Sequence, residues 1–345
     1  MKQALLYLSF GGPNGPDDVL GFMENVTKNR PIPRERLIEV SQHYHFFGGK
    51  SPINEINLEI IEKIKATFKL RGFDLPIYFG NRNWEPYVGD TVKQMALDGI
   101  EQAYVFATSA YGSYSGCRQY LQDIANANAS INGVLSLYKL RHFYNHQGFV
   151  EPFATGTINA IASLLESFSF GDIAILYSAH SIPESMAKSG PYEEQLAFVK
   201  SAISQHLLNK FKVDILSEQV FQSRSGSPQQ RWLEPDISDA MQRLHSSNNT
   251  RAFVVVPIGF ISDHMEVIYD LDTVGKQTAI DLGSRYERVP TPSLSLGFAE
   301  MIADLVQEQL DPTFHAEFID GSPQPIPVCA QDCCLTPNPG NHQRV

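Results

Sequence analysis

The chain has 345 residues, a formal net charge of −11, and a composition of 43% hydrophobic and 19% charged residues. This length favours two domains, and this composition is typical of a soluble globular protein without a segment apolar enough to span a bilayer. The negative charge argues against a nucleic-acid partner, because phosphate backbones bind concentrated basic surfaces.

Apolar runs alternate with amphipathic stretches through the first part of the chain, which is typical of βαβ units. The first run is too short for a signal peptide and lacks a cleavage motif, so we predict a cytoplasmic protein. We predict strands at 3–9, 76–80, 102–108 and 135–139, and helices near 16–27, 52–70, 88–98 and 150–168.

A second series follows, with strands near 172–177, 213–222 and 251–257 and helices near 191–209, 236–246 and 264–272. We therefore expect an α/β protein of two doubly wound domains with parallel sheets, at 1–158 and 159–290. A helix at about 293–310 is amphipathic and is expected to pack back on the first domain. Residues 311–345 form a Pro-rich tail.

Two predicted strands lead directly into ionisable side chains, the first into His180 and the second into Asp263, His264, Glu266 and Asp270. Because ligands bind at the carboxyl ends of parallel strands, His180 and the His264/Glu266 pair are expected to face one crevice. A helix capped near Asp263 would place Asp263, Glu266 and Asp270 on one face, able to hold or relay a divalent cation. The alternative is that each histidine caps a helix or packs in the core.

Basic residues gather at Lys28, Arg30, Arg34 and Arg36. This cluster suits either an anion-binding role or a solvated helix face.

The four cysteines are Cys117 and the clustered tail residues Cys329, Cys333 and Cys334. Thiols stay reduced in the cytoplasm, so zinc or an iron–sulfur cluster is expected before disulfides. The C-x3-C-C spacing lacks the paired C-x2-C of common zinc sites, which favours an iron–sulfur cluster over zinc. A redox-sensitive tail is the remaining alternative.

Three separated motifs resemble ferrochelatase and occur in the order of that family: SAHSIP at 178–183, FQSRSG at 221–226 leading to WLEP at 232–235, and PIGFISDHMEVIYD at 257–270. The resemblance extends to about residue 310, and the tail resembles that of cluster-bearing actinobacterial members. Further matching segments are LSFGGP at 8–13, GGKSPIN at 48–54, GNR at 80–82 and YGSYS at 111–115.

The resemblance implies insertion of ferrous iron into a porphyrin held between two Rossmann-like, chelatase-like domains. It places His180 against the pyrrole nitrogens as proton acceptor or iron-delivery ligand, with Glu266 beside it to accept protons or guide metal. His264 and Asp270 match the family's internal acidic track. Imidazole and carboxylate independently suit this chemistry, because they bind Fe(II) without retaining it as thiolates would.

The resemblance also assigns substrate contacts. Arg82 matches the family's basic distal position, and Phe10 replaces a tyrosine found in some members and can pack on the macrocycle. Trp232 lines either the cleft or the core. The candidates for hydrogen bonds to porphyrin propionates are Arg30, Ser51, Ser113 and Ser115.

By the same matching, Cys117 lies close to the family's lone upstream cluster ligand, and Cys329, Cys333 and Cys334 complete the four ligands of a 2Fe-2S cluster. A cluster outside the cleft implies a structural or sensing role.

Actinobacterial-type members act on coproporphyrin III, so we expect that substrate, with coproheme as product, and protoporphyrin IX as the alternative. A cobalt or nickel chelatase, or a haem-binding protein without catalytic activity, could use the same crevice but is less favoured. We expect a monomer, with at most weak peripheral membrane contact.

Overall fold

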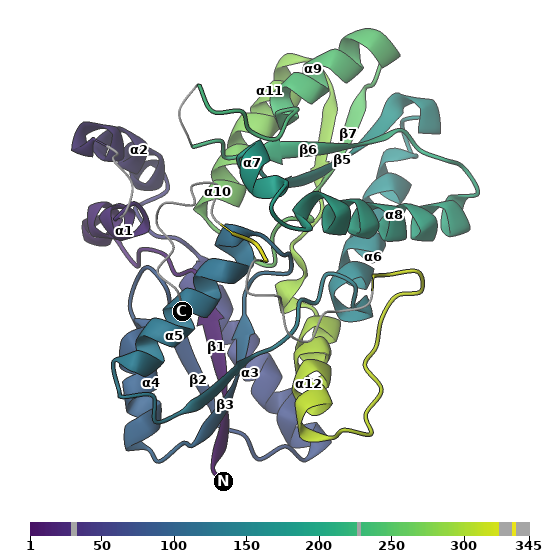
Figure 1. The fold of residues 1–345 in the computed structure, drawn as a ribbon. Helices are drawn as coiled ribbons and strands as arrows, with labels where there is room; N and C mark the ends of the chain where they lie inside the picture. The colour runs from purple at the N-terminus through teal and green to yellow at the C-terminus, as the bar shows by residue number, and fades with distance from the viewer. Residues whose placement is uncertain (29–32, 226–228, 324–332, 336–345) are drawn as a thin grey trace.

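The computed structural model describes residues 1–28, 33–225, 229–323 and 333–335, and these form two parallel sheets with helices on both faces (Figure 1). The first sheet has the order β2-β1-β3-β4 and the second the order β6-β5-β7-β8. The expected doubly wound α/β class is therefore confirmed. Arg30 and Cys329 lie outside the described residues.

The four strands of each sheet are parallel throughout. Those of the first sheet are β1 (Gln3–Ser9), β2 (Ile77–Asn81), β3 (Gln102–Ala107) and β4 (Ser136–Lys139). Those of the second are β5 (Ile173–His180), β6 (Ser217–Gln222), β7 (Ala252–Val256) and β8 (Arg285–Arg288). The central strands are buried on both faces, which is why they occur in the sequence as unbroken apolar runs.

The main helices connect successive parallel strands or flank the two sheets. Those connecting or flanking the first sheet are α1 (Val19–Val26), α2 (Arg34–Phe46), α3 (Ile53–Arg71), α4 (Val88–Leu97), α5 (Gln119–Ala129) and α6 (Gln147–Leu164). Those of the later chain are α8 (Tyr192–Phe211), α9 (Ile237–Asn248), α11 (Lys276–Asp281) and α12 (Leu296–Leu310).

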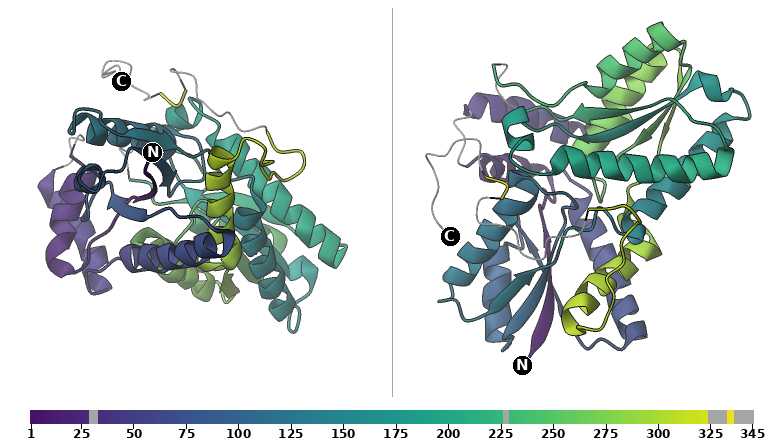
Figure 2. Two further views of the ribbon diagram at one scale, coloured as in Figure 1. Left: turned by 90° about the horizontal axis from the view of Figure 1, so that it is seen from below. Right: turned by 45° about the vertical axis from the view of Figure 1, so that its right-hand side comes forward.

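One hydrophobic core joins the two halves of the chain. It takes side chains from β1 and β3 of the first sheet, from β5 and β7 of the second, and from helices between them, including Phe149 and Phe153 of α6 and Phe298 of α12. Separate clusters fill the outer face of each sheet. Helix α12 packs against α3 and α6, as the three ribbon views agree (Figures 1 and 2). Helix α6 continues without a break through the expected boundary at residue 158.

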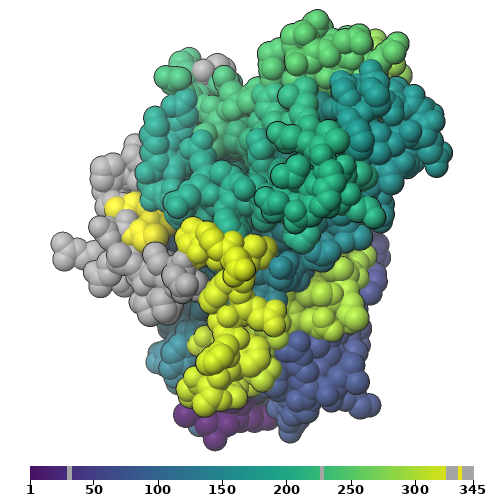
Figure 3. Space-filling model, turned by 90° about the vertical axis from the view of Figure 1, so that its right-hand side faces the viewer, coloured from purple at the N-terminus to yellow at the C-terminus, as the bar shows by residue number. Residues whose placement is uncertain are grey.

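The segment after α12 lies on the molecular surface, where Figure 3 shows it in yellow. The backbone N–H of Ile319 donates to the Asn145 carbonyl at 2.9 Å, and the Arg141 guanidinium lies 4.4 Å from the Phe318 ring centre. Further along, the hydroxyl of Ser189 donates to the carbonyl of Leu335 at 3.0 Å. These contacts attach the described parts of the tail to the body.

Helices α2 and α5 and strand β8 are absent from the sequence-based prediction. Helix α2 buries only Leu37 and Ser41 within its span, and β8 carries charged residues at both ends, so neither shows a strong apolar pattern. Helix α5 follows a π-helical turn, η2 (Tyr114–Arg118), and is rich in Ala and Asn. Tertiary packing decides these elements more than local propensity does.

Candidate active site

Each sheet reverses its strand order next to its first strand, between β1 and β3 and between β5 and β7. Ligands of open α/β sheets bind at such points, outside the carboxyl ends of the strands. Phe10 and Arg82 directly follow β1 and β2, while His180 ends β5. The segment that leads to Glu266 follows β7. The topology therefore places these residues at the ligand-binding edges of the two sheets.

His180 and Glu266 meet at the edge of the second sheet. Nε2 of His180 lies 3.6 Å from Oε2 of Glu266, and the two side chains are 33% and 46% exposed. Nδ1 of His180 lies 2.5 Å from the Ser181 carbonyl, which can only accept a hydrogen bond. In the neutral imidazole the proton therefore sits on Nδ1, and the lone pair of Nε2 faces Glu266. This pair offers a base and a carboxylate to solvent and ligand.

The backbone around His180 is held by close packing. The phenol of Tyr192 donates to the His180 carbonyl at 2.9 Å, and the N–H of Gly259 donates to the Ser178 carbonyl at 3.0 Å. A Cβ on Gly259 would lie 2.6 Å from the Cα of Ala179. The loop after β7 can therefore approach β5 this closely only with glycine at position 259.

The expectation that Asp263 caps the helix and shares a face with Glu266 is wrong. Asp263 instead accepts hydrogen bonds from Nη1 and Nη2 of Arg288, at 3.1 and 2.9 Å, and from the Thr291 hydroxyl. The cap is His264, whose Nδ1 accepts from the N–H of Glu266 at 3.2 Å, and α10 (Met265–Val267) begins after it. Asp263 is thus engaged in a charge-assisted pair with Arg288, at the end of β8.

A second carboxyl group lies one turn beyond Glu266. The short α10 continues as the π-helical segment η4 (Ile268–Gly275), which carries Asp270. Asp270 accepts hydrogen bonds from the Ser223 hydroxyl and from Nε2 of Gln222, and burial raises its pKa to about 6. Burial also lowers the pKa of His264, against the opposing charge of Glu266. Asp270, with its pKa of about 6, thus adds a group that titrates near neutrality beside the His180–Glu266 pair.

The residues expected to bind substrate have mixed surroundings. Phe10 is 38% exposed. The Ser113 hydroxyl accepts from the N–H of Gly116 at 2.9 Å and so caps η2, while the Ser115 hydroxyl lies 3.8 Å from Sδ of Met186. Ser51 and Trp232 are buried, and the indole N–H of Trp232 has no hydrogen-bond partner among the described residues.

The serine-bearing segment is attached to the second half of the chain. The phenol of Tyr111 donates to the Ile258 carbonyl at 2.7 Å, and the N–H of Gly112 donates to Oε1 of Gln195 at 2.7 Å. Met186 belongs to α7 (Glu184–Ala187), shortly after His180. Ser115 therefore lies where the two halves meet, on the same side as the His180 strand end.

Sequence reasoning assigned no role to three aromatic residues around Glu266, namely His43, Tyr44 and Tyr269. The His43 ring stacks on the Tyr269 ring with centres 4.2 Å apart, so α2 touches η4 one turn after Glu266. Burial and the negative charge of Glu266 raise the pKa of Tyr44. The spacing of Tyr269 and Glu266, three residues apart on a helix, was the one available signal.

The tail cysteines adjoin the segment that leads to Cys117. Sγ of Cys333 and Sγ of Cys334 are 3.5 Å apart, and both Cys117 and Cys334 are buried. A Cβ on Gly190 would lie 3.0 Å from Sγ of Cys334 and 3.3 Å from the Gly112 carbonyl oxygen. A glycine at position 190 therefore makes room for the Cys334 sulfur beside the chain that leads to Cys117.

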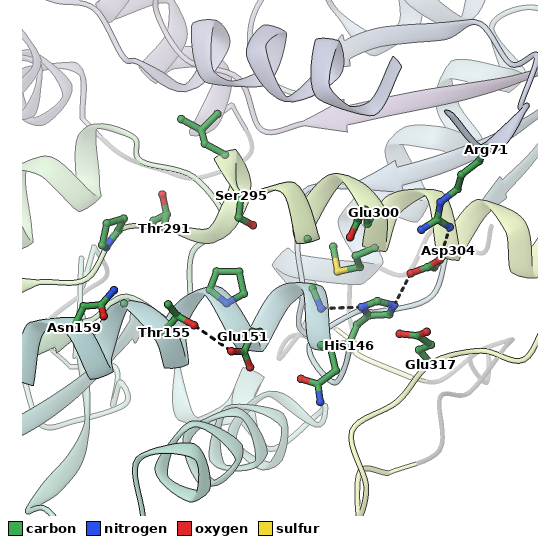
Figure 4. A pocket seen from close by; sticks show the side chains of 18 residues that line it. Arg71, His146, Glu151, Thr155, Asn159, Thr291, Ser295, Glu300, Asp304 and Glu317 are labelled. Atoms are coloured by element: carbon green, nitrogen blue, oxygen red, sulfur yellow. Dashed lines mark hydrogen bonds and ion pairs between the residues drawn. The ribbon is translucent and has the colours of Figure 1, made fainter. Parts of the chain in front are cut away.

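A separate groove of about 730 Å³ runs between α6 and α12, and Figure 4 shows its side chains. Within the described parts of the chain, His146, Asp304 and Glu317 there form the group with metal-ligand spacing. Nδ1 of His146 accepts from the N–H of Gly148 at 3.0 Å, so a neutral ring directs Nε2–H toward Asp304, 3.3 Å away. Arg71 also pairs with Asp304. Asp304 is therefore already engaged by Arg71 of α3 and by His146, the residue before α6.

None of the helices in the described residues combines the length and the apolar character needed to cross a membrane.

The model of the family described as ferrochelatase matches residues 2–310. The coproporphyrin III ferrochelatase of Mycolicibacterium smegmatis is 45% identical over 329 residues, 94% of either chain. A ferrochelatase of Rhodopirellula baltica is 41% identical over 333 residues, 96% of this chain and 93% of that one. The solved structure of SirB from Bacillus subtilis with Fe3+ shares the fold at a TM-score of 0.53 and 11% identity, covering 92% of this chain and 100% of that one. With a strand-end histidine and glutamate in contact and a match over most of its length, the chain belongs to the ferrochelatase family.

Proposed function

We propose that the protein inserts Fe(II) into coproporphyrin III to form coproheme. The observation that carries the proposal is the 3.6 Å contact between Nε2 of His180 and Glu266 at the ligand-binding edge of the second sheet. The close relative from M. smegmatis bears the name coproporphyrin III ferrochelatase, which supports this choice of substrate.

Metal insertion exchanges two pyrrole N–H protons for one Fe(II), so the site must accept two protons. The Nε2 lone pair of His180 can take one, because Nδ1 already donates to the Ser181 carbonyl. The Glu266 carboxylate can take the other. Asp270 lies one turn further, and its pKa of about 6 lets it hold or release a proton near neutral pH. Imidazole and carboxylate oxygen also bind Fe(II) weakly enough to pass it on.

The test is an anaerobic assay with purified protein, Fe(II) and either coproporphyrin III or protoporphyrin IX, followed by the metalloporphyrin spectrum. We expect many turnovers and a higher kcat/KM with coproporphyrin III. Faster turnover of protoporphyrin IX would assign that substrate instead. Binding of porphyrin in a one-to-one ratio without turnover would contradict the enzyme.

We also propose that Cys117, Cys329, Cys333 and Cys334 hold a 2Fe-2S cluster. The proposal is supported by the close pair of Cys333 and Cys334 sulfurs and by the space that Gly190 leaves for the Cys334 sulfur beside the segment leading to Cys117. A bound cluster would tie the tail to the body where Ser189 already holds Leu335. Iron and acid-labile sulfide analysis with a visible spectrum tests this. Zinc, or an absence of sulfide, would contradict it.

The division into domains at 1–158 and 159–290, the cytoplasmic location and the monomeric state stay predictions. Sedimentation of the purified protein over a range of concentrations tests the monomer.

A further inference from the structure

Arg82 is held on two sides by one helix. Its guanidinium carbon lies 4.4 Å from the centre of the Tyr120 ring, and its Nε pairs with the carboxylate of Asp123. Tyr120 and Asp123 are three residues apart on α5, so they project from the same helix face. Tyr120 covers a flat face of the guanidinium and Asp123 holds an edge of it. The Arg82 side chain is left only 9% exposed.

The rest of the guanidinium lies beside Ser115 and Phe10, two residues expected to bind substrate. Nη1 lies 3.5 Å from the carbonyl of Ser115, and the guanidinium carbon lies 6.0 Å from the centre of the half-exposed Phe10 ring. A guanidinium carries five N–H donors, and the contacts to Asp123 and Ser115 occupy two of them. The described residues provide no further hydrogen-bond acceptor for Arg82. Donors therefore remain for a ligand beside Phe10 and Ser115.

We propose that Asp123 and Tyr120 are positioning residues that orient Arg82 to bind a carboxylate-bearing porphyrin. This inference rests on the proposed function and deepens it, because it names how one substrate anchor is held. A guanidinium recognises a carboxylate through N–H groups in a fixed plane, so the orientation of that plane decides the strength of binding. Stacking on Tyr120 sets the plane, and pairing with Asp123 sets the rotation within it.

The alternative is a pair that only stabilises the fold. Such a pair would affect unfolding without affecting porphyrin affinity through Arg82. A double-mutant cycle separates the two, since residues that act through one another show effects that do not add.

The experiment measures binding of metal-free coproporphyrin III by fluorescence titration in the wild type, Arg82→Gln, Asp123→Asn and the double variant. We expect each single change to raise the dissociation constant roughly tenfold and the double variant to match Arg82→Gln alone. Asp90→Asn, an exposed carboxylate on α4 of the same half, is the matched control and should bind normally. Thermal unfolding of every variant shows that the compared proteins are folded.

Unchanged affinity in Asp123→Asn, or a double variant in which the two losses multiply, would overturn the inference. The titration needs neither iron nor turnover. If the wild type inserts iron while Asp123→Asn binds normally, only this inference fails. If the wild type neither binds coproporphyrin III nor inserts iron into it, the proposed function fails with it.

Discussion

Nε2 of His180 and Oε2 of Glu266 lie 3.6 Å apart, although one residue ends β5 and the other follows β7. The two strands are hydrogen-bonded neighbours, so their carboxyl ends emerge side by side. The Ser181 carbonyl sets the tautomer of the imidazole, which leaves its lone pair directed at the carboxylate. The contact thus depends on strand order, and the backbone acceptor leaves Nε2 as the nitrogen that can take up a proton beside the carboxylate.

Replacing His180 with alanine should lower the rate of iron insertion by at least about a hundredfold, because loss of a positioned general base has that size of effect. Affinity for metal-free coproporphyrin III should stay within a few-fold. Initial rates under anaerobic conditions and a porphyrin titration measure the two. His315→Ala, an exposed histidine near the tail, is the control and should be fully active. Normal rates in His180→Ala would exclude it as the base.

The Glu266→Gln variant should insert iron about tenfold more slowly than the wild type, since the amide keeps the shape of the side chain but cannot accept a proton. The same anaerobic assay, run from pH 6 to 9, measures it. Asp281→Asn, on exposed α11 in the same segment, should leave the rate unchanged. Equal rates for Glu266→Gln and the wild type at every pH would remove Glu266 from the proton path.

Asp304→Asn should be less stable than the wild type at neutral pH by about 3 kcal/mol, because it leaves the Arg71 guanidinium without its charge partner. Burial raises the pKa of Asp304, but hydrogen bonds from His146 and Arg71 outweigh it and hold the pKa below its ordinary 3.8. The ionised form therefore stabilises the fold above that pH, and its contribution is lost as the pH falls through the lowered value.

Denaturant unfolding from neutral pH down to below pH 3.8 measures the difference, which should shrink toward the acid end. Glu300→Gln, an exposed carboxylate one turn earlier on α12 in the same groove, should behave as the wild type does. A pH-independent loss of stability in Asp304→Asn would point to packing and not to charge.

The Gly259→Ala variant should be destabilised by more than about 2 kcal/mol and should insert iron slowly. Its added Cβ would lie 2.6 Å from the Cα of Ala179, so the loop after β7 must move away from His180. Gly89→Ala on α4 is the matched control. A Cβ at position 89 meets nothing within 4 Å, so this variant should raise the free energy of unfolding by up to about 1 kcal/mol. Unfolding curves and iron-insertion rates of the two variants compare a glycine in close contact with its neighbours with one that faces open space.

The periodicity of the sequence predicted seven of the strands to within a few residues. Buried parallel strands such as β1 and β7 must be apolar on both faces, so their continuous apolar runs can be recognised in the sequence. Helix α2 has little buried surface of its own, and it meets η4 where His43 stacks on Tyr269. A contact between residues so far apart in the chain has no local signal.

The sequence by itself determined the α/β class, the family, and the placement of His180 and Glu266 after buried strands. Local hydrophobic pattern and residue type are enough for these. Only the tertiary structure decided which charges pair: Asp263 with Arg288, Arg82 with Asp123, and Asp304 with Arg71. Ion pairs form between those charged groups that strand order and helix packing bring within a few ångströms of one another. Neither strand order nor helix packing can be read from the local sequence.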